Sequence, residues 1–144
     1  MREFEPLVLL AVPESDCHVV ACKLLELYLK KHGYRVMNLG VTTPSSEIAD
    51  AVARLRPIAV FISGQNGHAL SDLSGLKDEL AIRACSVPLF IGGKVTLGPV
   101  SDADEVQARF AEIGFTVLQS FNDAREALRK LVPPAHGARL PEAV

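Results

Sequence analysis

The chain has 144 residues, 49% of them hydrophobic, and a formal net charge of −2 with both signs mixed along the sequence. This composition predicts one globular domain with a real core, and the balanced charge gives no electrostatic footprint for nucleic acid or an acidic membrane surface. The first apolar run is too short for a signal peptide, and no run approaches the ~20 residues of a membrane span. The cysteines at 17, 22 and 85 have neither disulfide-framework nor zinc-site spacing, so we predict a reduced, cytoplasmic protein.

Apolar runs alternate with helical patterns along the chain. Strands are expected over residues 7–12, 35–39, 58–62, 87–91 and 115–118. Helices are expected from about 18 to 33, from 43 to 57, around 73–80, from 101 to 114 and from 122 to 131. Pro44 at a first helical position and a capping-box-like pair, Ser101 and Asp104, indicate two of the helix starts. One face of the first helix carries four apolar residues: Val20, Leu24, Leu27 and Tyr28.

The regular alternation of strands and helices predicts parallel strands joined by right-handed crossovers. The first, third and fourth runs are unbroken apolar stretches that suit central strands, whereas the second and fifth are shorter and more polar and suit the edges. The expected fold class is α/β: a flavodoxin-like (Rossmann-like) five-stranded parallel sheet of order 2-1-3-4-5 with helices on both faces. Its switch point lies between strands one and three. We expect one domain over residues 1–132 and a flexible tail over 133–144.

A carboxylate and a histidine lie two residues apart where the first strand passes into its helix. His18 on this loop is placed to reach a metal through one ring nitrogen, and Asp16 to hold the other. The alternative is that Asp16 caps the helix and His18 is an ordinary residue of its first turn. Further polar and small residues follow the other strands at the same sheet edge: Ser63, Gly64, Gln65 and Gly67; Gly92 and Gly93; Ser120 and Phe121.

Residue types argue against three other uses of such a fold. A phospho-acceptor receiver domain needs an aspartate where Ser63 stands. A flavin site needs a phosphate-cradling loop, but Glu14 and Asp16 would repel a phosphate. A hydrolase elbow needs G-x-S-x-G, and Ser63 lacks that context. The acidic, histidine-bearing loop favours a metal-centred ligand.

With these motifs the chain resembles the cobalamin-binding domains of adenosylcobalamin-dependent mutases and corrinoid methyltransferases. Their signature is D-x-H-x-x-G, then S-x-L, then G-G, and the resemblance covers about residues 6 to 132. The corresponding stretches here begin at Asp16, Ser63 and Gly92, with Ala21 in place of the signature glycine and Gln65 in place of the leucine. Within the family, the small subunits of glutamate mutases are most similar, because they share an S-D-C-H loop and a G-G-x-x-x-x-G stretch.

The resemblance implies a role for each matching residue. His18 would ligate cobalt in place of the cofactor's own dimethylbenzimidazole, Asp16 would hydrogen-bond the distal ring nitrogen, and Ser15 would support the loop. Ser63 would hydrogen-bond the nucleotide tail, and the glycine pair would let that tail lie against the sheet. Cofactor-binding residues are therefore expected at Ser15, Asp16, Cys17, His18, Val19, Ser63, Gly64, Gln65, Gly92, Gly93, Lys94, Val95 and Thr96.

The resemblance also implies a partner. We expect adenosylcobalamin as cofactor and a separate TIM-barrel subunit that covers the corrin and holds the substrate, because the first strand begins near Leu7 and leaves no room for a helical cap domain. This chain would then be a subunit, inactive alone, of a carbon-skeleton mutase that converts glutamate to 3-methylaspartate. The alternatives are a non-catalytic cobalamin carrier or sensor module, a corrinoid methyl-transfer protein, or a fold of this family that no longer binds cobalamin.

Overall fold

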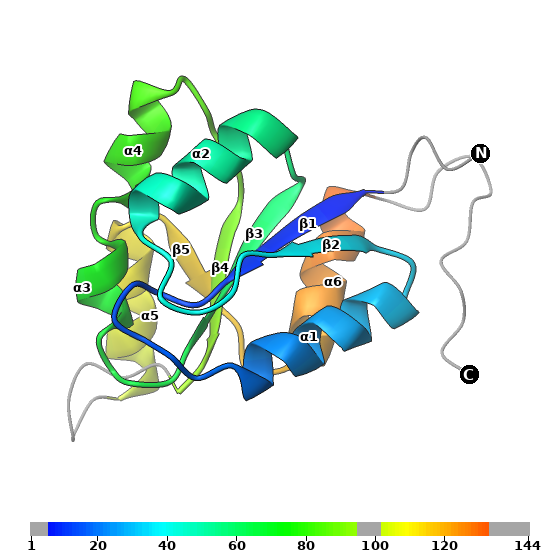
Figure 1. Ribbon diagram of the computed structural model, residues 1–144. Coiled ribbons are helices and arrows are strands. Elements are labelled where there is room, and N and C mark those ends of the chain that lie inside the picture. The colour runs from blue at the N-terminus through cyan, green and yellow to red at the C-terminus, as the bar shows by residue number, and fades with distance from the viewer. Residues whose placement is uncertain (1–5, 95–101, 133–144) are drawn as a thin grey trace.

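The computed structural model describes residues 6–94 and 102–132, and in these residues a five-stranded parallel sheet lies between two layers of helices (Figure 1). Strand order is β2-β1-β3-β4-β5, as predicted, and every neighbouring pair is parallel. The elements are β1 (Leu7–Ala11), α1 (Val20–Lys31), β2 (Arg35–Asn38), α2 (Ser45–Leu55), β3 (Ala59–Gly64), α3 (Ala69–Leu73), α4 (Leu76–Ile82), β4 (Leu89–Gly93), α5 (Ala103–Glu112), β5 (Phe115–Val117) and α6 (Phe121–Leu131).

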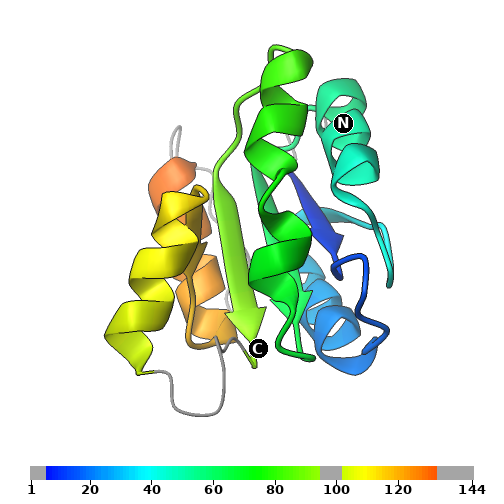
Figure 2. The same ribbon diagram turned by 90° about the vertical axis from the view of Figure 1, so that its left-hand side faces the viewer.

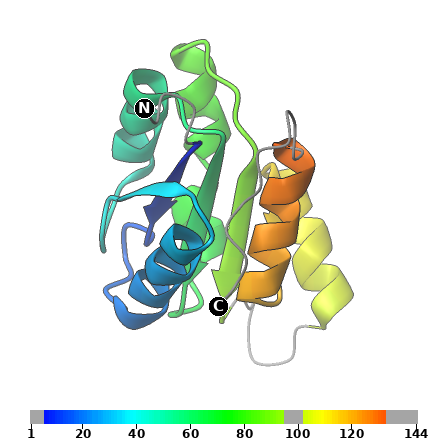
Figure 3. The same ribbon diagram turned by 90° about the vertical axis from the view of Figure 1, so that its right-hand side faces the viewer.

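Two apolar cores lie on opposite faces of the sheet. Alternate residues of β1 and β3 divide between them, since Leu9 and Val60 face one core and Leu10 and Phe61 the other. Helices α2, α3, α4 and α5 cover the first face, and α3, α4 and α5 can be followed in Figure 2. Helices α1 and α6 cover the second (Figure 3). All six residues of β3 are buried, whereas the edge strand β2 is half exposed, which confirms the predicted central and edge strands.

Of the apolar face of α1 that the sequence pattern indicates, only Tyr28 packs against the core under this helix, and it is partly buried. Val20, Leu24 and Leu27 are 67%, 51% and 54% exposed. The face turned to the sheet is instead formed by a second set of side chains: Cys22, Leu25 and Leu29. Leucines occupy both sides of this helix, so periodicity alone could not decide which side the sheet covers.

Two predicted helix starts are wrong by one or two residues. The N-cap of α5 is Asp102, whose carboxylate accepts a hydrogen bond from Glu105 N at 2.7 Å. Ser101, the predicted cap, lies outside the described residues. The N-cap of α6 is Ser120, whose hydroxyl accepts a bond from Asp123 N, so α6 begins at Phe121. In both cases the cap is the residue whose side-chain oxygen reaches the amide three positions on.

Three further boundaries differ from prediction. Pro44 is the N-cap of α2 and not its first residue. The single helix expected around 73–80 is two short helices, α3 and α4, and Gly75 is the N-cap of the second. Strand β4 begins at Leu89, directly after Pro88, which has no N–H to donate to a neighbouring strand. Within residues 6–94 and 102–132 no helix is long and apolar enough to cross a membrane.

Candidate functional site

The loop from β1 to α1 is organised around one buried carboxylate. Asp16 is 0% exposed, and its two carboxylate oxygens contact different partners. Oδ1 accepts hydrogen bonds from His18 N at 3.0 Å and lies 2.7 Å from His18 Nδ1. Oδ2 accepts bonds from Gln65 N at 2.7 Å and Asn66 N at 3.1 Å, both on the loop after β3. The N-cap of α1 is Val19, with no side-chain cap, so Asp16 is not the helix cap that one interpretation of the sequence proposed.

These hydrogen bonds keep the carboxylate ionised and fix which ring nitrogen of His18 faces it. Burial alone would raise the pKa of Asp16, but the hydrogen bonds from Gln65, His18 and Asn66 outweigh it, and the pKa lies below its ordinary 3.8. An ionised carboxylate only accepts, so His18 Nδ1 carries the proton that it donates to Asp16. The lone pair of the neutral imidazole is then on Nε2, on a side chain that is 59% exposed. This arrangement presents one imidazole nitrogen to a metal from a fixed direction.

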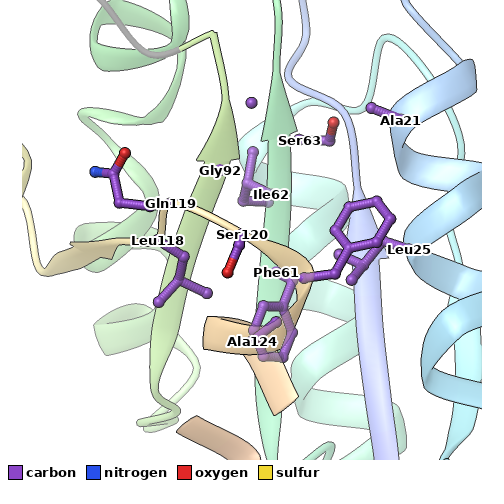
Figure 4. A pocket seen from close by; sticks show the side chains of 12 residues that line it. Ala21, Leu25, Phe61, Ile62, Ser63, Gly92, Leu118, Gln119, Ser120 and Ala124 are labelled. Carbon is purple, nitrogen blue, oxygen red and sulfur yellow. The ribbon is translucent and has the colours of Figure 1, made fainter. Parts of the chain in front are cut away.

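An apolar pocket of about 210 Å³ opens beside this loop, between α1 and α6 and against the carboxyl ends of the central strands (Figure 4). In the view of Figure 4, Ser63 and Ala21 lie toward its upper end, and Phe61, Leu118 and Ala124 toward its lower end. Its lining is Ala21, Leu25, Phe61, Ile62, Ser63, Gly92, Gly93, Leu118, Gln119, Ser120, Phe121 and Ala124. The pocket therefore lies against β3 and β4 near the carboxyl edge of the sheet, the edge predicted for the ligand.

The glycines of the site serve different purposes. A Cβ added to Gly92 would be in ordinary contact, 3.6 Å from Leu118 O, so the fold itself tolerates a side chain there and its absence leaves room in the pocket. Gly93 has φ +98°, and a Cβ on it would collide with Gly64 O and with Gln65 Nε2. A Cβ on Gly64 would lie 3.2 Å from the side chain of α3 residue Ala69, so Gly64 is explained by helix packing.

The structure brings together most of the predicted site residues. The side-chain amide of Gln65 lies beside Gly93, and Gly93 and Ala21 both line the pocket. Cys17, Val19 and Lys94 are exposed around the same edge. The predicted residues 95 and 96 lie outside the described part of the chain. In that described part, no group of three or more histidine, cysteine or acidic side chains is placed to hold a metal ion.

Two kinds of site residue could not be predicted from the sequence. Leu25, Phe61 and Ala124 line the pocket without polar chemistry to single them out, although the alternation along β3 places Phe61 on the same face as Ser63. Asn66 was also missed. Its backbone N–H holds Asp16 and its side chain holds Ser15, and no sequence spacing links positions about fifty residues apart.

Residues 6–129 match the family model described as the B12 binding domain, and the chain belongs to that family. Two named relatives are particularly informative. The chain is 39% identical to glutamate mutase sigma subunit 1 of Haloarcula marismortui over 125 residues, which are 86% of this chain and 82% of that protein. It is 36% identical to the glutamate mutase sigma subunit of Halobacterium salinarum, covering 89% of this chain and 85% of that protein.

Solved structures show the same fold. A cobalamin-binding protein from Desulfitobacterium hafniense superposes with a TM-score of 0.72 at 24% identity, covering 90% of this chain and 60% of that one. The methanol:cobalamin methyltransferase complex of Methanosarcina barkeri gives 0.71 at 21% identity, covering 88% of this chain and 46% of that one. This chain thus spans about half to three fifths of those chains.

The residues present fit a cobalamin. His18 can offer Nε2 to a metal, because its Nδ1 is engaged by Asp16, and that bond is the outer-shell partner typical of a metal-binding histidine. The neighbouring pocket is mostly apolar and has serine hydroxyls at Ser63 and Ser120, which suits a flat aromatic base carried on a polar linker.

Proposed function

We propose that this chain is the cobalamin-binding subunit of a glutamate mutase-like isomerase. The observation that carries the proposal is the imidazole of His18, held at 2.7 Å by a fully buried Asp16 on the loop that leads into α1, the helix whose first turn lines an apolar pocket at Ala21. Membership of the B12-binding family and the similarity to glutamate mutase sigma subunits support it. Those relatives also favour the mutase subunit over the carrier, sensor or methyl-transfer alternatives.

Each residue of the site has a defined task. His18 ligates cobalt through Nε2, and Asp16 keeps the Nδ1 proton in place and increases the electron density on the ligating nitrogen. The pocket between α1 and α6 takes the nucleotide tail, with Ser63 as its hydrogen-bonding group and Gly92 providing room. The chain would hold the cofactor through these residues, and Ser15 supports the loop that carries His18.

The cofactor is adenosylcobalamin, which supplies a carbon-centred radical when bound. Radical chemistry requires a dry site and a positioned substrate, and neither is available at an open sheet edge. A separate catalytic subunit must therefore cover that edge, and we assign it a TIM-barrel architecture. The isolated chain is inactive, and with its partner it converts glutamate to 3-methylaspartate.

The cobalt ligand is tested on cob(II)alamin bound to protein labelled with ¹⁵N-histidine. Electron paramagnetic resonance should show the nitrogen splitting change from a triplet to a doublet, because the ligating nitrogen belongs to the protein. His18→Ala should abolish the change, whereas the control His68→Ala, an exposed histidine on the next loop, should keep it. A triplet in the labelled wild-type protein would refute the assignment.

The subunit role is tested with adenosylcobalamin, glutamate and a candidate catalytic subunit. Substrate-dependent cob(II)alamin and 3-methylaspartate should form only in the mixture. Turnover by the isolated chain would refute the subunit role. Cobalamin binding without turnover, with every candidate partner, would instead favour a carrier.

A further inference from the structure

The segment after β3 holds the histidine loop at two consecutive residues. Asp16 is held through its side chain, as described above. Ser15, the residue before it, is held independently: its hydroxyl donates to Asp72 Oδ2 at 2.6 Å and its backbone N–H points at the same oxygen at 3.2 Å. Asn66 Nδ2 donates to Ser15 O at 2.9 Å and also contacts its hydroxyl oxygen at 3.2 Å.

Both anchoring side chains are themselves fixed. The Oδ1 atom of Asn66 accepts a hydrogen bond from His68 N at 3.0 Å, which directs the Nδ2 donors toward Ser15 and settles the orientation of the amide. Asp72 lies in α3, and its backbone carbonyl accepts a bond from the hydroxyl of Ser45 at 3.2 Å. Asp72 therefore belongs to a helix and Asn66 to the loop that leads into it, whereas the loop that they hold is exposed at Ser15 and His18.

The peptide group between Ser15 and Asp16 is held at both of its polar atoms. Asp16 N donates to Pro13 O at 2.9 Å within the loop, and Ser15 O accepts from Asn66 Nδ2 at 2.9 Å from the segment after β3. The bonds to Ser15 therefore add an anchor outside the loop to the local turn, and together they fix the direction in which the Asp16 carboxylate meets His18. Because metal binding depends on ligand direction, a small rotation here would change the direction in which Nε2 is offered to a metal.

We infer that Asn66 and Asp72 are positioning residues that set the orientation of His18 for cobalt ligation. The inference deepens the proposed function and rests on it for the cobalt, but the preorganisation of His18 is a property of the protein alone. Neither side chain is required to touch the cofactor.

The predicted effects separate hydrogen bonding from charge. Asp72→Ala removes both bonds to Ser15 and should weaken cobalamin binding about tenfold, within the ~10–100-fold range typical of lost outer-shell partners. Asp72→Asn should bind like the wild type, because an amide oxygen accepts the same two bonds. Asn66→Asp should weaken binding more than Asn66→Ala, since it places a carboxylate oxygen against Ser15 O. Asp78→Ala, which removes an exposed acid in the first turn of α4, is the matched control.

Two measurements identify a positioning role. In the cob(II)alamin complex, the Asp72→Ala protein should show a smaller fraction of cobalt with the histidine splitting, even at saturating cobalamin. In the cofactor-free protein, the ¹⁵N shifts of the His18 ring should move from the Nδ1-protonated tautomer toward a mixture. Ser15→Ala is a small change at an exposed site, so this protein is expected to fold. It should shift both readouts in the same direction, which keeps the test decisive if another variant misfolds.

The inference is overturned if the Asp72→Ala and Asn66→Ala proteins both fold and keep the wild-type affinity for cobalamin, the wild-type histidine splitting and the wild-type ¹⁵N shifts of the His18 ring. Equal losses in Asp72→Asn and Asp72→Ala would also overturn it, because they would assign the effect to charge. Failure of the wild-type protein to bind cobalamin would refute the proposed function instead, and the ring shifts of the cofactor-free variants would still test the preorganisation of His18.

Discussion

Replacing Asp16 by asparagine should destabilise the protein before any cofactor is considered. Each carboxylate oxygen accepts two donors, from His18 on one side and from Gln65 and Asn66 on the other. An amide has only one accepting oxygen. With that oxygen toward Gln65 and Asn66, its NH2 group faces His18, whose ring can change tautomer and accept at Nδ1 but whose backbone N–H loses its acceptor. A hydrogen bond to a charged group contributes about 1.5–3 kcal/mol, so losing one costs about that much, and the bonds that remain are to a neutral oxygen. Total stabilities are about 5–15 kcal/mol, which makes this a large loss.

Urea denaturation of the cofactor-free protein measures this loss. Cys17→Ala, at the exposed neighbouring position, is the control and should change the free energy of unfolding by less than about 0.5 kcal/mol. The folded-state pKa of Asp16 is lowered, so its stabilisation is complete above the ordinary 3.8 and is lost as the pH falls through the folded value. The wild-type and Asp16→Asn curves should therefore converge below pH 3.8. A loss under about 1 kcal/mol at neutral pH, or curves that stay parallel into acid, would refute the reasoning.

Three further predictions rest on other sites. Gly92→Ala should keep the melting temperature but weaken cobalamin binding about tenfold, because the added methyl group overfills the pocket. Gly93→Ala should lower the melting temperature, because its Cβ collides with Gly64 O. The reverse pattern would contradict the pocket assignment. The lysine and asparagine partners of Glu26 lower its pKa to about 2, so the free energy of unfolding of the wild type should fall as the pH drops from about 4.5 to 2. The Glu26→Gln protein should not show this fall. Burial and nearby arginines lower the pKa of His32, so the wild type should lose stability as the pH falls below 6.5, and titrations of His32→Leu should lack that loss.

The architecture and the candidate metal ligand could be predicted from the sequence alone. Unbroken apolar runs indicated the central strands, shorter polar ones indicated the edges, and their alternation with helices predicted the strand order that the structure confirms. These signals are local, because the hydrophobic periods of strands and helices involve residues that are close together in the sequence. The pair Asp16 and His18 was visible for the same reason, since the two residues that meet are only two positions apart.

The tertiary structure decided everything that depends on which distant segments meet. Both sides of α1 carry leucines, and only packing against β1 and β3 selected Leu25 and Leu29 over Leu24 as the buried set. The pocket exists because the beginnings of α1 and α6 come together over the sheet. The buried charge of Asp16 is tolerated because backbone N–H groups from a loop about fifty residues away satisfy it. Backbone donors are common to nearly every residue, so no side-chain pattern could have foretold that contact.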